Sequence, residues 1–173
     1  MTFFWIISAI IILFGFVVFF GAPYVPSKRK ELQRVFDELY KLTDADTLVD
    51  IGSGDGVVLR VASEKGVSKA VGYELNIALV WISRFLSRRH KNIEVIMGNS
   101  WQMQFPSETT VVYLFGVSRD MEKHARKLQQ QTNTLGRPLA LVVYGHTIPH
   151  MTPLKSFGAH HLYTFTPLHV KKT

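Results

Sequence analysis

The stretch Val49-Asp50-Ile51-Gly52-Ser53-Gly54-Asp55-Gly56 decides the fold of this chain. It ends an apolar run, 47–51, that predicts a buried strand, and it precedes residues 57–64, which predict a helix stopped by Gly66. Glycines in such a turn let the backbone approach a ligand closely, and the start of the helix supplies free N–H groups. The stretch therefore predicts a strand–turn–helix unit that binds a nucleotide-like ligand.

Strands and helices alternate along the rest of the chain. Further strands are expected at 69–74, 93–97, 110–115, 139–144 and 161–166, and further helices at 76–90 and 118–132. A helix over 28–42, capped by Ser27, has an apolar face that includes Leu32 and Phe36. We expect Trp81 to lie in the core. This order predicts an α/β fold, Rossmann-like and doubly wound, with a mostly parallel sheet.

The spacing of the glycines narrows the kind of ligand. In a dinucleotide-binding G-x-G-x-x-G turn the third glycine would stand at Val57, whereas this chain has D-x-G-x-G-x-G. The acid inside the strand, Asp50, would repel a pyrophosphate and suits a ligand with a positive end. Glu74 ends the second strand, where a carboxylate can accept both ribose hydroxyls. Asn99 and Ser100 follow the third strand, where an amide and a hydroxyl can meet an adenine edge.

Together these features resemble the class I, seven-strand family of S-adenosylmethionine-dependent methyltransferases, over about residues 47–144. Four segments in order, 21–26 after an apolar segment, 50–56, 72–76 and 114–117, resemble the small membrane-anchored protein-lysine methyltransferases that modify the ATP synthase c-subunit and the adenine nucleotide translocase, and their prokaryotic relatives. The resemblance implies methylation of a lysine on a protein at or in a membrane. Two departures are Asn99, which replaces an acid common in the wider fold, and a tail after Tyr144 that is short for a complete seventh strand.

The resemblance also implies roles for single residues. It puts Asp50 near the amino-acid end of S-adenosylmethionine, the glycines under it, and Glu74 on the ribose, while Asp55 either orders that end or caps the next helix. The expected cofactor-binding residues are Asp50, Gly52, Ser53, Gly54, Asp55, Gly56, Glu74, Asn99 and Ser100. No catalytic base is assigned, because desolvation beside a sulfonium lowers the pKa of a lysine amine. The segment 115–117 is not the [DN]-P-P-[FY] loop of amide and base methyltransferases.

The N-terminal segment 3–20 carries no charged residue. As a helix it would be about 27 Å long, close to the hydrocarbon core of a bilayer at about 30 Å. It lacks the basic start of a signal peptide, and an all-apolar core helix is unusual at the end of a small domain. We therefore expect an uncleaved single-pass anchor over 1–22, a juxtamembrane linker and amphipathic helix over 23–46, and a methyltransferase domain over 47–173. The basic residues 28–30 place that domain on the cytoplasmic or matrix side.

Composition and charge narrow the function classes. The chain has 173 residues, a net charge of +7 and no cysteine, which excludes disulfide scaffolds, thiolate metal sites and cysteine nucleophiles. Basic residues concentrate in 60–91, and beside an anchor they favour contact with the anionic surface of a membrane bilayer over binding of nucleic acid. His146 and His150 are four residues apart, but Pro149 between them argues against a shared helix face, so no metal site is expected.

Two questions stay open at the level of the sequence. The aromatic residues Tyr24, Trp101, Phe115 and Tyr144 either line a channel for a lysine amine or pack in the core and at the interface. Besides a lysine methyltransferase, the sequence allows a methyltransferase for a lipid or a small lipophilic molecule. It also allows an anchored module that binds a cofactor or partner without catalysis. The sequence does not determine an oligomeric state.

Overall fold

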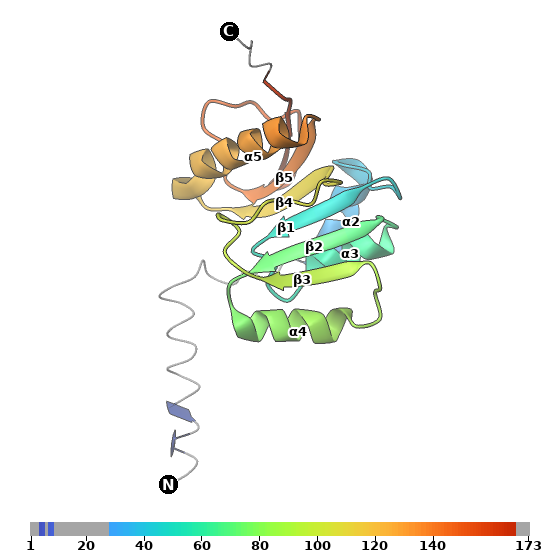
Figure 1. Ribbon diagram of the computed structural model, residues 1–173, viewed down its shortest axis with the longest axis vertical. Coiled ribbons are helices and arrows are strands. Elements are labelled where there is room, and N and C mark those ends of the chain that lie inside the picture. The colour runs from blue at the N-terminus through green and yellow to red at the C-terminus, as the bar shows by residue number, and fades with distance from the viewer. Residues whose placement is uncertain (1–3, 6, 9–27, 169–173) are drawn as a thin grey trace.

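The computed structural model describes residues 4, 5, 7, 8 and 28–168 and has one seven-stranded sheet at its centre (Figure 1). The strand order is β3-β2-β1-β4-β5-β7-β6. The strands are β1 (Thr47–Ile51), β2 (Lys69–Glu74), β3 (Ile93–Met97), β4 (Val111–Gly116), β5 (Leu139–Gly145), β6 (Lys155–Phe157) and β7 (His160–Phe165). The first five pair in parallel, and β7 is antiparallel to both β5 and β6. The predicted α/β fold with a mostly parallel sheet is confirmed.

Four α-helices and one short 3₁₀ helix surround the sheet in the described part of the chain. They are α2 (Arg29–Glu38), α3 (Val57–Glu64), α4 (Ile77–Ser87), η1 (Ser118–Asp120) and α5 (Met121–Leu135). The prediction for the first helix was wrong at both ends. The residue at the N-cap position of α2 is Lys28 rather than Ser27, and its side chain makes no capping hydrogen bond; the C-cap residue is Leu39. The chain then turns so that Thr43 and Tyr40 can donate hydrogen bonds to Asp46.

The core consists of two layers, one on each face of the sheet. One layer joins α2 and α3 to the strands, and in it Leu32, Val35 and Phe36 of α2 are almost fully buried. The other layer lies between the sheet and α5 and includes Met121 and Leu128. Helix α2 is therefore built into the domain that carries the glycine-rich turn.

The C-terminal tail completes the sheet, which the short length of the tail did not suggest. The expected strand 161–166 is β7, and three further residues form β6. Gly158 has a φ of +57° in the turn between them. His160 on β7 is buried, with its ring nitrogen 3.1 Å from the hydroxyl of Tyr113 on β4. Both strands of this hairpin are short, and β6 is too short to give a clear alternating pattern in the sequence.

The prediction that Trp81 lies in the core was wrong, because 67% of its surface is exposed. Helix α4 turns Val80, Ser83 and Ser87 towards the sheet. Ser83 meets the turn before α3 so closely that a Cβ on Gly56 would lie 2.2 Å from the Ser83 hydroxyl oxygen. Only small side chains fit at such a contact, so the large apolar residues of α4 point outwards.

The predicted anchor, 1–22, lies outside the described residues except for four positions. Within those four positions and 28–168, none of the helices combines the length and the apolar character that a bilayer crossing requires.

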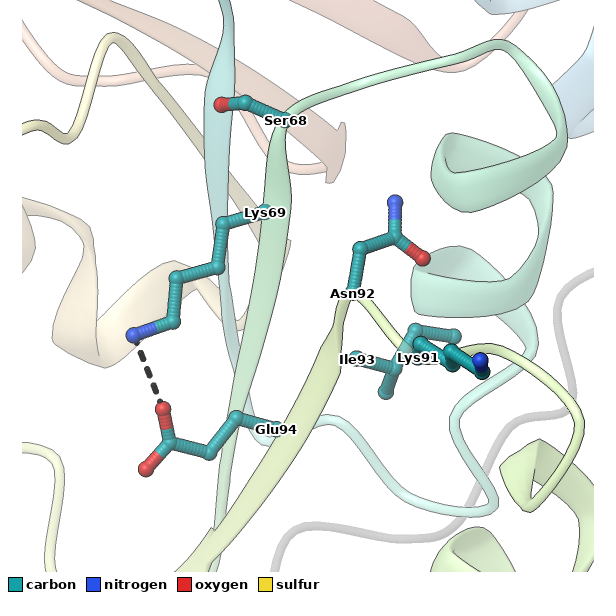
Figure 2. Close-up of a pocket in the computed structure, with 6 residues that line it drawn as sticks. All are labelled: Ser68, Lys69, Lys91, Asn92, Ile93 and Glu94. Carbon is teal, nitrogen blue, oxygen red and sulfur yellow. Dashed lines mark ion pairs between the residues drawn. The ribbon is translucent and has the colours of Figure 1, made fainter.

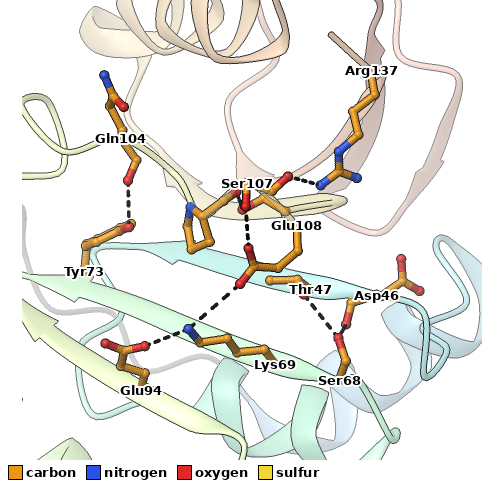
Figure 3. A network of polar contacts seen from close by, with 12 residues as sticks. Asp46, Thr47, Ser68, Lys69, Tyr73, Glu94, Gln104, Ser107, Glu108 and Arg137 are labelled. Carbon is orange, nitrogen blue, oxygen red and sulfur yellow. Dashed lines mark hydrogen bonds and ion pairs between the residues drawn. The ribbon is translucent and has the colours of Figure 1, made fainter. Parts of the chain in front are cut away.

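Polar contacts fasten the amino ends of the central strands to the loop before β4 (Figure 3). The Lys69 ammonium lies 2.9 Å from the carboxylate of Glu94 and 4.0 Å from that of Glu108. Arg137 donates to the carbonyl of Ser107 at 2.7 Å. These contacts lie at the amino ends of the strands, whereas the glycine-rich turn lies at the opposite, carboxyl ends.

Candidate active site

The glycine-rich turn is held against the carboxyl end of β2. The amides of Gly52 and Ser53 both donate to the carbonyl of Tyr73, at 2.9 and 3.1 Å. Gly52 has a φ of +74°, which side chains other than glycine rarely adopt, and a Cβ at this position would meet no atom within 4 Å. The turn therefore exposes backbone to open space, as a surface that receives a ligand would.

Glu74 is fixed by two backbone amides. One carboxylate oxygen accepts from the amide of Gly54 and the other from the amide of Asn76, both at 2.8 Å. A carboxylate has about four acceptor positions, so each oxygen can accept a further hydrogen bond. The two amides orient the carboxylate at the rim of the turn, where it can accept from a pair of neighbouring hydroxyls.

Asp50 is a buried acid beneath the same turn. Only 3% of its surface is exposed. Burial raises the pKa of Asp50 well above its ordinary value of 3.8, and the negative charges of Glu74 and Asp55 raise it further. A ligand with a positive end would offset both effects. The acid thus fits the ammonium and sulfonium groups of S-adenosylmethionine, and the open surface at Gly52 fits a ligand lying over the turn.

Asp55 and Ser53 serve the local structure in different ways. The Asp55 carboxylate accepts from the amide of Val57 at 3.1 Å, which caps the start of α3, and it lies 3.2 Å from the guanidinium of Arg60. Of the two roles expected for Asp55, the structure therefore contains helix capping. The Ser53 hydroxyl is buried and has no hydrogen-bond partner among the described residues. It packs on Gly72, where a Cβ would lie 2.5 Å from the hydroxyl oxygen.

Asn99 and Ser100 come close to Glu74 through strand pairing. Glu74 pairs with Met97 across β2 and β3, and the amide of Gly98 donates to the Glu74 carbonyl at 3.0 Å. The side-chain oxygen of Asn99 accepts from the amide of Trp101 at 3.0 Å, so its NH₂ group remains as the donor for a ligand. All the residues expected at the cofactor site thus belong to one end of the sheet.

The sequence did not indicate how α5 holds the loop after β3. The Trp101 ring stacks on His124 with centroids 4.3 Å apart, and the Lys123 ammonium lies 4.0 Å from its centre. Burial lowers the pKa of His124 to about 4 and also lowers the pKa of Lys127, whose ammonium donates to the carbonyl of Met103 at 2.7 Å. A cation of this chain therefore already lies on the Trp101 ring. These contacts are far apart in sequence and leave no local pattern.

Two of the four aromatic residues for which the sequence left open either an amine channel or core packing lie side by side. Phe115 and Tyr144 face each other in register on β4 and β5, with ring centroids 5.6 Å apart, and both are half-buried. They lie near the carboxyl ends of these strands, the same end of the sheet as Glu74. Tyr24 lies outside the described residues.

A pocket elsewhere on the surface does not belong to this site (Figure 2). It is lined by Ser68, Lys69, Lys91, Asn92, Ile93 and Glu94, which lie at the amino ends of β2 and β3. Ligands of open parallel sheets bind at the carboxyl ends, so we assign no role to this pocket. Across the described residues, no three His, Asp or Glu side chains are grouped in a way that could hold a metal ion.

Comparison with known families agrees with this arrangement. The family model described as the ANTKMT methyltransferase domain matches residues 50–155, from the buried acid of β1 to the start of β6. The chain belongs to this methyltransferase family. The ANTKMT match covers the turn, the Glu74 strand and the Phe115–Tyr144 pair, and it confirms the family that the sequence resembled.

Relatives of the ANTKMT domain include lysine methyltransferases. The chain is 36% identical over 134 residues to the human lysine N-methyltransferase of the ATP synthase c-subunit, covering 76% of this chain and 54% of that protein. It is 32% identical over 115 residues to a protein-lysine N-methyltransferase of Saccharolobus islandicus, covering 63% and 69%. The chain spans about half the length of the human relative.

A solved structure shows the same fold. The RNA methyltransferase of Salinibacter ruber, in complex with S-adenosyl-L-homocysteine, superposes with a TM-score of 0.72 and 24% identity. The match covers 86% of this chain and 98% of that one. At this identity the likeness supports the fold alone.

Proposed function

We propose that this chain is an S-adenosylmethionine-dependent protein-lysine N-methyltransferase that acts on a membrane protein. The observation that carries the cofactor assignment is Glu74, fixed between the amides of Gly54 and Asn76 beside the open surface at Gly52. Membership of the ANTKMT family supports the reaction. The names of two relatives support a lysine acceptor, and the name of the human relative supports the c-subunit of ATP synthase as the substrate.

In this proposal each residue of the site contacts a different part of S-adenosylmethionine. Glu74 would accept hydrogen bonds from the two ribose hydroxyls, Asp50 would face the ammonium group of the amino-acid end, and the backbone at Gly52 would form the floor. The NH₂ group of Asn99 and the hydroxyl of Ser100 would hold the adenine. The bound cofactor supplies a methyl group on a sulfonium, which is already activated for transfer.

The acceptor lysine needs alignment and a free amine. Once the ammonium has released a proton to water, the nitrogen lone pair would form the new N–C bond while the C–S bond of the methyl donor breaks. We assign the Phe115–Tyr144 pair to the entry of this amine, because aromatic faces attract a cation within about 6 Å of the ring centre. Tight alignment at such an entry, rather than a dedicated base, then supplies the rate.

The proposal includes a membrane location. The uncharged segment 3–20 and the basic residues 28–30 support a single-pass anchor with the catalytic domain on the cytoplasmic or matrix side. Tethering raises the local concentration of the enzyme near substrates in the same membrane.

The decisive experiment incubates the detergent-solubilised full chain with methyl-labelled cofactor and a membrane extract. We expect label on a lysine of a small membrane protein, identified by mass spectrometry of peptides, and no label with Glu74→Ala. Label confined to the organic-solvent extract would favour a lipid methyltransferase. Cofactor binding by calorimetry without label in any fraction would favour a non-catalytic module.

A further inference from the structure

Most of the large apolar residues of helix α4 point outwards, whereas Val80 and two serines face the sheet. The outward α4 face consists of Leu75, which lies just before the helix, and five residues of the helix itself, each 43–67% exposed: Ile77, Trp81, Ile82, Phe85 and Leu86. On the inner side, the hydroxyls of Ser83 and Ser87 are buried without a hydrogen-bond partner among the described residues. This is the reverse of the pattern on a surface helix of a soluble domain, where the apolar stripe faces the core.

The position of α4 leaves this face uncovered by the described elements. The helix forms the lower border of the domain in Figure 1 and packs on β3 and β2. Within α4 the exposed apolar residues cover about half the circumference of the helix. Exposed apolar patches of this kind mark contact with another apolar body, and an apolar helix face of this width fits a helix that lies in the surface of a bilayer.

The charged residues of α4 and of the segment that directly follows it are all basic. Helix α4 contains no acidic residue. Arg88, Arg89 and Lys91 follow its last turn, and the Arg88 guanidinium lies 4.2 Å from the centre of the Phe85 ring. The Arg84 guanidinium donates to the carbonyl of Val95, which keeps it off the outward face. An apolar face with Trp and Phe and a basic end is typical of helices that lie in the interface of an anionic membrane.

We propose that the outward α4 face lies in the interface of an anionic bilayer, with the helix parallel to the membrane plane. Leu75 belongs to the face and directly follows Glu74, so this docking places the cofactor end of the sheet at the membrane surface. The inference rests on the membrane location in the proposed function and deepens it. It does not depend on methyl transfer.

The test uses the absence of cysteine from the chain. Ile82→Cys and Phe85→Cys are made singly in the full chain and carry a nitroxide, with Gln130→Cys on the exposed side of α5 as the matched control. Each protein is reconstituted in vesicles of phosphatidylcholine and phosphatidylglycerol. Power saturation then compares the accessibility of the label to oxygen, which concentrates in lipid, and to a water-soluble nickel complex.

At positions 82 and 85 we expect an oxygen-to-nickel accessibility ratio several-fold above that at 130, because the apolar face of an interfacial helix is buried in lipid. Equal ratios at all three positions would overturn the proposal. Low accessibility to both reagents at 82 and 85 would mean that protein covers the face, for example the segment 3–20. Dipolar broadening between labels would mean that a second copy of the chain covers it. Either result would overturn bilayer docking.

A charged variant tests whether the apolar character of the face is what holds it in lipid. Trp81→Glu with Phe85→Glu, in an Ile77→Cys background, should move the label at 77 into water, while thermal unfolding stays unchanged because both side chains are exposed. A label at 77 that stays in lipid would contradict the proposal. Failure of methyl transfer with the labels still in lipid would contradict the proposed function alone.

Discussion

The carboxylate of Glu74 accepts the amide hydrogen of Gly54 at 2.8 Å, which ties the end of β2 to the middle of the glycine-rich turn. A side chain that is expected to bind the cofactor therefore also shapes the turn beneath it. Binding and local structure depend here on the same oxygen atoms, and substitutions can separate the two contributions.

Replacing Glu74 by Gln should weaken cofactor binding by about 100-fold, or about 3 kcal/mol, a value typical of lost hydrogen bonds to a charged group. The amide group of Gln cannot accept from the backbone amides of both Gly54 and Asn76, so the carboxamide turns or the loop shifts. Titration calorimetry with S-adenosylmethionine measures the effect. Glu122→Gln on the exposed side of α5 is the control and should keep wild-type affinity. Equal affinity of both variants would remove Glu74 from the site.

A comparison of Gly52→Ala with Gly66→Ala distinguishes the effect of backbone strain on stability from the effect of an added methyl group on cofactor binding. Gly52 and Gly66 both have a positive φ, +74° and +89°, and at both a Cβ would meet nothing within 4 Å. Each alanine variant should therefore lose about 1–2 kcal/mol of unfolding free energy. Only Gly52→Ala puts a methyl group on the surface proposed for the cofactor, so only this variant should lose affinity. Denaturant unfolding and calorimetry on both proteins check the contrast. Loss of affinity in both variants would point to a general effect of strain.

Asp50→Asn should stabilise the free protein and weaken cofactor binding. The pKa of Asp50 is raised in the folded state, so the folded protein holds this proton to higher pH than the unfolded chain does. The contribution of Asp50 to stability is therefore greatest below the ordinary pKa of 3.8 and falls as the pH rises towards the raised value. Asn at this position carries no charge, so it removes the cost of burying a carboxylate near neutral pH. Its gain in melting temperature should be present near neutral pH and should vanish towards about pH 4.

Thermal unfolding at several pH values measures this trend, with Asp44→Asn in an exposed turn as the control. A variant that is less stable than the wild type near neutral pH would show that the buried charge has a favourable partner in the folded protein.

Asp46→Asn should destabilise the fold by about 2–4 kcal/mol, because the Asp46 carboxylate is buried and accepts four hydrogen bonds. Burial by itself would raise the pKa of Asp46, but donors on Thr110, Thr43 and Tyr40 outweigh it and hold the pKa below 3.8. This stabilisation is therefore present above pH 3.8 and is lost as the pH falls through the lowered pKa. Urea midpoints of Asp46→Asn and of Thr110→Val, which removes one donor, measure the effect. A midpoint of Asp46→Asn equal to that of the wild type would contradict it.

The sequence predicted the parallel part of the sheet because its strands are continuous apolar runs bounded by turn residues. The ranges expected for β1, α3, β2 and β3 agree with the structure residue for residue. The turn and Glu74 were predicted to come together because the carboxyl ends of neighbouring parallel strands meet at one edge. The assignment of Asp50, Gly52, Ser53, Gly54, Asp55, Gly56, Glu74, Asn99 and Ser100 to a cofactor stays a prediction.

The orientation of α4 could not be predicted from periodicity. Its sequence, IALVWISRFLS, is apolar on nearly every side, so no face is marked as inner. The choice is made by the close contact between Ser83 and Gly56, a distance that only the folded chain defines. The contact of Trp101 with α5 and the three-residue strand β6 likewise depend on residues far apart in sequence.

Because α2 is packed into the core, the connection between the proposed membrane anchor and the domain is short. Leu32, Val35 and Phe36 fix this helix to the sheet, and Glu31 lies 3.6 Å from buried His160 on β7, so α2 does not act as a flexible spacer. If the segment 3–20 crosses a bilayer as proposed, only eight residues, 21–28, connect it to α2, and they extend at most about 28 Å. A domain of this size has a radius of gyration of about 15 Å, and its diameter exceeds that reach. The domain could then change its tilt on the membrane, but it could not turn its opposite side towards the bilayer. Lysines beyond the reach of this connection would therefore not be methylated, whatever the sequence around them.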